Sequence, residues 1–382
     1  MSRLSSLGSY TLLCISCLTI MVGAVVAPGL ASISMSLGVA DHAGFLITLP
    51  ALGAVLFAPF AGRLIDRFGA YPCTFVALFL YGALGVSGQW LSGPIAVYSN
   101  RIALGAMTTV VMAGSTTLIS QFYVGHERLK MIARQGMAVE AGGVIFLFIG
   151  GLLAVQSWEL PFFIYLVAWL FLGMLFLFVP DTSAQPGSLA ESPESSGSGS
   201  RSLLWVYLSA CMAMMIFFTV IVVLPLSMEK SGYSADHIGL LLAFISFVAV
   251  ITAHFLPRVN LRWKDKGTLS LAFVFYALGH LAFYVGASVS VLVLGGLLAG
   301  MGFGLSIPLL NHMTVERSDP GQRGKNLSYF AMAIFLGQFL TSFVELVSGH
   351  FLYLIAALVA ALYGICVWVV FAQRSPAAPT AS

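Results

Sequence analysis

The chain has 382 residues, of which 59% are hydrophobic and 8% are charged. A soluble domain has about a quarter of its residues charged, so this chain cannot cover the surface of a water-soluble fold. The formal net charge of +3 is too small to indicate a nucleic-acid partner. The composition therefore predicts an integral membrane protein that is surrounded by the lipid bilayer.

A membrane-spanning helix needs about 20 mostly apolar residues. The first apolar segment is too long for the core of a signal peptide, so we interpret it as a span. Six such segments precede a polar stretch and six follow it, which predicts an all-α membrane protein with twelve transmembrane helices. The predicted spans are residues 10–36, 44–62, 72–91, 95–123, 132–155, 161–179, 203–227, 236–257, 268–287, 290–312, 325–346 and 351–372.

The polar stretch between the two sets covers residues 181–202 and is rich in Ser, Gly and Pro. It has too few apolar residues to form a core, so we expect a flexible linker. The predicted domains are a six-helix bundle at residues 1–180, the linker at 181–202 and a second six-helix bundle at 203–382. No soluble domain is expected.

The basic residues predict how the spans are oriented. The chain has 17 Lys and Arg residues. With the N-terminus placed in the cytoplasm, Lys230 falls outside the cell membrane and Arg101 falls within a span. All the other Lys and Arg residues fall at the inner face. Cytoplasmic loops of membrane proteins carry an excess of Lys and Arg. We therefore expect a multi-pass protein of a bacterial inner membrane with both termini in the cytoplasm.

Two short strings recur in the same order in the two halves. Val25-Val26-Ala27-Pro28 and Ala40-Asp41-His42-Ala43-Gly44 in the first half correspond to Val222-Val223-Leu224-Pro225 and Ala235-Asp236-His237-Ile238-Gly239 in the second. Asp41 and Asp236 are 195 residues apart. This pattern predicts a duplicated six-helix unit, an architecture that occurs among secondary transporters.

The segment after the second predicted span reads Gly62-Arg63-Leu64-Ile65-Asp66-Arg67-Phe68-Gly69-Ala70-Tyr71. It resembles the G-x-L-x-D-R-x-G-R-[RK] loop of the major facilitator superfamily, in the same place between helices two and three. The matching residues are Gly62, Leu64, Asp66, Arg67 and Gly69, whereas Ala70 and Tyr71 replace the usual basic residues.

The resemblance implies that Asp66 meets the positive N-terminus of helix eleven and latches the two halves in the outward-facing state. Arg67 would then pair with Glu127 at the end of helix four. The alternative is that these charges only belong to the usual charge pattern of a cytoplasmic loop and make no latch. At the offset of 195 residues Leu261 takes the place of Asp66, so we expect the corresponding latch of the second half to be weak or different.

Arg101 and Glu140 are ionisable residues well inside predicted spans, where charge is costly and usually functional. Arg101 and Gly105 also resemble the family's helix-four motif, which is linked to proton coupling. We hypothesise that Arg101 and Glu140 face a central cavity and interact, and that Glu140 exchanges a proton or binds a cationic part of the substrate. The alternative is a static buried ion pair.

Other residues in the spans are weaker candidates. We expect Gln338 to be either a cavity hydrogen bonder or a contact between helices, and His280 to be structural or lipid-facing. Three prolines, Pro28, Pro225 and Pro308, permit helix bending. The candidate cavity residues are Asn311, His312 and Gln338.

No metal or cofactor is expected. Cys14 and Cys17 form a C-x-x-C pattern without a further His or Cys pair, and catalytic and nucleotide-binding motifs are absent from the sequence. The chain is therefore predicted not to be an enzyme, and a polytopic membrane enzyme remains a remote alternative.

These observations favour a monomeric secondary transporter that works by alternating access and exchanges protons for a small amphipathic molecule or drug. The alternative is a proton-coupled importer of a small nutrient. In helix five Phe146-Leu147 replace the Gly-Pro of the family's proton-coupled exporters, although the closing pair Gly150-Gly151 is present, and this departure weakens the efflux interpretation.

Overall fold

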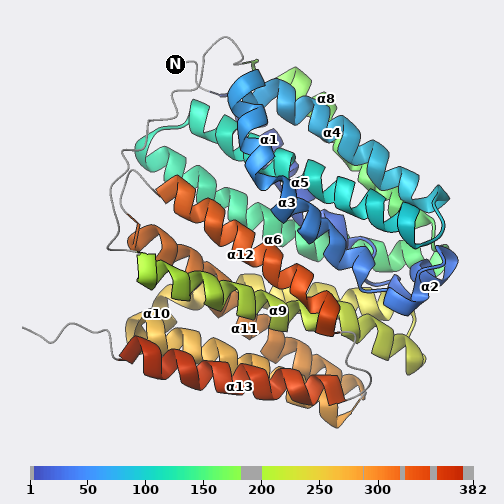
Figure 1. Cartoon of the computed structure of the whole chain (residues 1–382), viewed down its shortest axis with the longest axis vertical. Coiled ribbons are helices and arrows are strands. Elements are labelled where there is room, and N and C mark those ends of the chain that lie inside the picture. Colours follow the sequence, from blue (N-terminus) through green and yellow to red (C-terminus); the bar gives the residue numbers. More distant parts are fainter. Residues whose placement is uncertain (1–3, 182–199, 287, 319–322, 345–350, 373–382) are drawn as a thin grey trace, which may run out of the picture.

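The computed structural model describes residues 4–181, 200–286, 288–318, 323–344 and 351–372, and every regular element in these ranges is a helix. Figure 1 shows two groups of helices side by side, α1 to α8 in one and α9 to α13 in the other. The predicted all-helical fold with two bundles is confirmed. Most of the predicted linker, residues 182–199, lies outside the described residues.

The first half contains all the short helical segments of the described chain. Its helices are α1 Ser6–Ala24, α2 Leu30–Ser36, η1 Ala40–His42, α3 Phe45–Phe68, α4 Ala70–Ser87, η2 Gly88–Trp90, α5 Pro94–Phe122, α6 Gly125–Gln156, α7 Leu160–Phe163, η3 Ile164–Leu166 and α8 Val167–Phe178. The helices of the second half are α9 Ser200–Lys230, α10 Ala235–Val285, α11 Val289–Glu316, α12 Arg323–Val344 and α13 Phe351–Ala372.

The first predicted span is divided in the structure. α1 ends at Ala24, α2 begins at Leu30, and Pro28 lies between them. A proline has no N–H to donate and its ring clashes with the preceding turn, which ends a helix. Pro225 and Pro308, by contrast, lie inside α9 and α11.

The number of spans depends on how α10 is counted. Among the described residues, 11 helices are long and apolar enough to cross a membrane, and the 51-residue α10 is one of them. Its backbone leaves the helical region at Lys264, where φ is 57° and ψ is 173°. α10 therefore supplies two spans, and the total agrees with the predicted twelve.

Helix contacts repeat between the halves at the offset seen in the sequence. A Cβ atom on Gly105 would lie 1.9 Å from the carbonyl oxygen of Pro50, and one on Gly300 would lie 2.5 Å from that of Ile245. Gly300 lies 195 residues after Gly105, and Ile245 lies 195 residues after Pro50. This is the same offset as that between Asp41 and Asp236. The duplicated sequence therefore folds into duplicated helix packing.

The halves touch through α3 against α12 and α6 against α10. We call the end of the bundle that carries residues 62–69 the motif end, and the end that carries residues 40–44 and 231–235 the opposite end. At the opposite end the hydroxyl groups of Thr48 and Ser342 are hydrogen bonded. A Cβ atom on Gly151 would lie 2.9 Å from the Cα atom of Gly239, so these backbones are also in contact.

Gly105 offers a test of this packing. Gly105→Ala should destabilise the fold by ~1–3 kcal/mol, because the added methyl group collides with the Pro50 carbonyl at the contact of α3 with α5. The measurement is the melting temperature of the purified protein in detergent. Gly173→Ala is the matched control, since a Cβ atom there meets nothing within 4 Å. Equal melting temperatures for the two variants would contradict the packing.

Candidate functional site

A cavity of about 60 Å³ lies between the two halves. Residues of α1, α3, α5 and α6 line it from the first half, and residues of α9 to α12 line it from the second. Helices from both halves therefore form its wall, so that any relative movement of the halves changes its shape.

The cavity wall is mostly apolar. Four phenylalanines come from the second half, namely Phe217, Phe218, Phe303 and Phe335. The rings of Phe217 and Phe303 lie 4.2 Å apart between centroids. An aromatic wall of this kind suits the apolar body of an amphipathic molecule better than a heavily hydroxylated sugar.

Glu140 on α6 is the one ionisable side chain among the described residues that line the cavity. The uncharged polar side chains on the wall belong to Thr19, Thr108, Ser246 and Gln338. A carboxylate in such surroundings favours a proton or a cationic group close to it. The cavity therefore combines one acid with an aromatic wall.

The sequence around Glu140 fixes α6 against α1. A Cβ atom on Gly142 would lie 2.9 Å from the Cβ atom of Cys17, so α1 and α6 are in close contact here. The thiol of Cys17 donates a hydrogen bond of 3.0 Å to the carbonyl of Ala138. Both contacts lie within one helical turn of Glu140 and hold its backbone in place.

A buried polar cluster around Gln135, on the same helix as Glu140, was missed in the sequence. The side-chain nitrogen of Gln135 lies 2.9 Å from the hydroxyl of Ser16, 3.0 Å from that of Thr116 and 3.3 Å from that of Ser115. The cluster joins α1, α5 and α6. The available signal was an uncharged polar residue, Gln135, inside the apolar span predicted at residues 132–155.

Arg101 on α5 is buried inside the first half, with a side chain that is 1% exposed. Its Nη1 atom donates a hydrogen bond of 3.1 Å to the hydroxyl of Tyr165. Its guanidinium carbon lies 5.2 Å from the ring centroid of Phe162 and 5.9 Å from that of Tyr165, which are cation–π distances. The hydroxyl of Tyr165 donates in turn to the carbonyl of Val22.

The expected contact between Arg101 and Glu140 is therefore not made. Among the ion pairs of the described residues none joins these two side chains, and Arg101 is absent from the cavity wall. The reason is the rotation of α5, which turns Arg101 toward the aromatic residues of η3 and α7. Arg101 reaches the cavity only indirectly, through Tyr165 and the cavity residue Val22.

His280 plays a comparable part in the second half. Its side chain is 1% exposed, and its Nε2 atom lies 3.1 Å from the carbonyl oxygen of Ile216 on α9. Phe217, next along the chain, takes the place of Ile20 at the offset that relates Pro28 to Pro225, and both residues line the cavity. Each half thus has a buried polar side chain that leads to a backbone carbonyl of its first helix. Of the two expectations for His280, its burial agrees with the structural role and not with the lipid-facing one.

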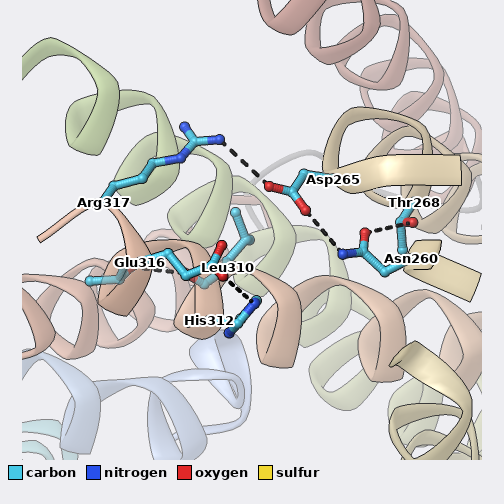
Figure 2. Close-up of polar contacts among 8 residues, drawn as sticks. Asn260, Asp265, Thr268, Leu310, His312, Glu316 and Arg317 are labelled. Atoms are coloured by element: carbon cyan, nitrogen blue, oxygen red, sulfur yellow. Dashed lines mark hydrogen bonds and ion pairs between the residues drawn. The ribbon is translucent and has the colours of Figure 1, made fainter. Parts of the chain in front are cut away.

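Asn311 and His312 are exposed on α11 and do not line the cavity. Figure 2 shows His312 turned toward Glu316, with 3.1 Å between Nε2 and Oε1. The two residues are one turn apart on the same helix. Gln338 alone of the three candidate cavity residues lies on the cavity wall.

The motif residues lie at the surface of the motif end. Gly69 has φ 90°, a conformation that favours glycine, and it separates α3 from α4. Asp66 is exposed, and within the described residues no hydrogen bond or ion pair joins it to α12. The side chain of Leu64 is 42% exposed and Gly62 has open space around it.

Arg67 and Glu127 have other neighbours. The guanidinium carbon of Arg67 lies 5.2 Å from the ring centroid of Phe68. Glu127 lies in the first turn of α6 and not at the end of α5 as expected, and its carboxylate pairs with Lys130 at 3.0 Å. No group of three His, Cys, Asp or Glu side chains that could hold a metal comes together among the described residues.

Two related helical halves around a central cavity define a polytopic membrane transport protein. The sequence profile of the Major Facilitator Superfamily matches residues 12–342 and 206–382, and the chain belongs to this superfamily of transporters. It is accordingly a transporter and not an enzyme.

Curated relatives include two tetracycline resistance proteins. The chain is 32% identical over 194 residues to the class D protein of Salmonella ordonez, in an alignment that covers 47% of this chain and 45% of that protein. It is 26% identical over 303 residues to the class B protein of Escherichia coli, covering 75% and 73%. This chain thus spans less than half of the class D protein.

Among solved structures, a D-xylose–proton symporter superposes with a TM-score of 0.75 at 18% identity. The superposition covers 95% of this chain and 98% of that one. At this identity the likeness shows the fold alone. It agrees with the twelve-span architecture described above.

The hydrogen bonds of Tyr165 can be tested by a double-mutant cycle. Arg101→Ala and Tyr165→Phe should each destabilise the protein, by ~1–3 kcal/mol for a buried group left without its partner. Because both remove the same hydrogen bond, the double variant should lose less than the sum, with a coupling of ~0.5–3 kcal/mol. Thermal unfolding of the four proteins provides the measurement, and strictly additive losses would refute the contact.

Proposed function

We propose that the protein is a proton-coupled exporter of small amphipathic molecules that works by alternating access. Glu140 is the exchange site: its carboxylate holds either a proton or a cationic group of the substrate. The protein acts as a monomer in a bacterial inner membrane, with both termini in the cytoplasm. The position of Glu140 supports the coupling to protons, and the contacts between the two halves support alternating access.

The position of Glu140 carries the proposal. It is the single ionisable residue on the described cavity wall, and it faces aromatic side chains of the opposite half. A charged carboxylate is costly in apolar surroundings, so it is stabilised by a proton or by a cation, and each displaces the other. Exchange of the two at one site couples substrate movement to a proton gradient.

The size of the cavity supports movement between conformations. Small-molecule sites have volumes of roughly 300–1,000 Å³, and this cavity has about 60 Å³. A drug-sized molecule therefore needs the halves to separate before it can bind. Contacts of Thr48 with Ser342 and of Gly151 with Gly239 hold the opposite end together, which favours opening at the motif end.

Asp66 fits this cycle as a latch. In this conformation it is exposed at the motif end. When the motif end closes and the opposite end opens, Asp66 would meet the N-terminus of α12, where the helix dipole stabilises an anion. Gly69 supplies the tight turn that keeps the loop short. In this proposal Arg67 pairs with Glu127 when the motif end closes.

The relatives of this chain favour export. Two of them are tetracycline resistance proteins and others are described as multidrug resistance proteins of Bacillus subtilis. Resistance of this kind is consistent with an amphipathic substrate that leaves the cell. The alternative of a proton-coupled importer has the same carboxylate but the opposite direction of transport.

Glu140→Gln is the test of the exchange site. The variant keeps the shape of the side chain and cannot ionise, so pH-driven transport should fall by roughly 10²–10⁴-fold, the range that a positioned proton-transfer group contributes. The measurement is movement of tetracycline and of amphipathic cationic dyes in proteoliposomes under an imposed pH gradient. Outward movement against the proton flow supports export, and uptake with the protons supports import.

The control is Glu159→Gln, which removes an exposed carboxylate just beyond the end of the same helix, outside the cavity. It should transport like the unmodified protein. A Glu140→Gln rate equal to that of the control would remove Glu140 from the coupling step. Movement of none of the solutes under any gradient would contradict proton-coupled transport of amphipathic molecules.

A further inference from the structure

The second-half counterpart of the motif loop has features that the transport cycle does not use. The backbone turn is the same in both halves: Gly69 has φ 90°, and Lys264, which occupies its place at the repeat offset, has φ 57°. Glycine is the residue that this conformation favours. A lysine at this position therefore indicates that its charged side chain has a use.

Basic residues gather around this turn. Arg258, Arg262 and Lys264 are exposed and Lys266 is partly exposed. The neighbouring carboxylate of Asp265 is already engaged, by a hydrogen bond of 3.0 Å from Asn260 and an ion pair with Arg317 at 3.9 Å, as Figure 2 shows. The four cations therefore face the surface with their nearest acid turned toward α11.

Two tryptophans lie beside these cations. The Nζ atom of Lys266 lies 5.4 Å from the ring centroid of Trp368 on α13. Gly267 lies between the two indoles, because a Cβ atom on it would be 3.1 Å from the Cβ atom of Trp263 and 3.5 Å from the ring of Trp368. Trp263 is 49% exposed and Trp368 is 47% exposed. Tryptophan prefers the level of the lipid headgroups.

The first half lacks this cluster although its backbone is similar. At the repeat offset Phe68 takes the place of Trp263 and Tyr71 takes that of Lys266. The helical turn thus forms without the indoles and the lysines. Their presence in the second half alone needs a reason other than the fold.

We propose that this cluster binds the headgroup of an anionic phospholipid at the motif end of the second half. Lys264 and Lys266 bind the phosphate, Arg258 and Arg262 add to the positive field, and Trp263 and Trp368 flank the glycerol and upper acyl region. The side chain of Leu261, which is 78% exposed next to this cluster, lies against the acyl chains. Clusters of basic residues beside a membrane span attract anionic lipids in this way.

The test measures lipid retention and does not depend on the transported solute. The purified protein is mixed in detergent with equal amounts of phosphatidylglycerol and phosphatidylcholine, and native mass spectrometry counts the lipids that remain bound. The unmodified protein should retain phosphatidylglycerol preferentially. In Lys264→Gln/Lys266→Gln its apparent affinity should fall about fivefold for each charge removed.

Matched variants separate this site from general charge effects. Arg63→Gln/Arg128→Gln removes two exposed charges from the same end of the first half and should leave lipid retention unchanged. Lys264→Arg/Lys266→Arg keeps the charges and should keep the lipid. If the glutamine variant aggregates, Arg258→Gln/Arg262→Gln removes two other charges of the cluster with the same expected loss.

Three results would overturn the proposal. The first is equal retention of the two lipids by the unmodified protein. The second is retention by the glutamine variant at the level of the unmodified protein, or an equal loss in the first-half control. The third is displacement of the lipid by inorganic phosphate at the same concentration, which would mean that the cluster binds free phosphate and not a membrane lipid.

Discussion

The interior of a bilayer has no water to complete hydrogen bonds, so each polar group in a span needs a partner within the protein or a place on a cavity. Arg101 meets this constraint in part, through Tyr165 and two aromatic faces, and His280 meets it in part through the carbonyl of Ile216. Within the described residues, the Nε and Nη2 atoms of Arg101 and the Nδ1 atom of His280 are buried without a hydrogen-bond partner. Glu140 instead lies on the wall of the cavity between the halves. Its carboxyl group is therefore the one that a proton or a substrate can reach.

The two buried polar side chains act on equivalent helices. Arg101 is linked through Tyr165 to Val22 of α1, and His280 is linked to Ile216 of α9, next to Phe217. Val22 and Phe217 both lie on the cavity wall. In each half, the position of the first helix thus depends on a polar contact from deeper in the same bundle. Each contact therefore holds part of the cavity wall in place within its own half.

Much of the fold could be predicted because hydropathy, basic residues and the repeat each report on long stretches of chain. The twelve spans and the duplicated halves follow from them. The partners of individual side chains did not follow, since they depend on the rotation of each helix about its axis. Arg101 and Glu140 face different directions. Gln135 on α6 contacts residues of α1 and α5, and no sequence spacing relates these helices to it.

Alternating access requires the contact between Thr48 and Ser342 at the opposite end to break in each cycle. The direct test is Thr48→Cys/Ser342→Cys in a protein without its native cysteines, because the two hydroxyls are hydrogen bonded and cysteines there lie close enough for a disulfide. Transport of tetracycline or an amphipathic dye in proteoliposomes is measured before oxidation, after it and after reduction. The account predicts that the disulfide stops transport and that reduction restores it. Transport at an unchanged rate with the disulfide fully formed would contradict it.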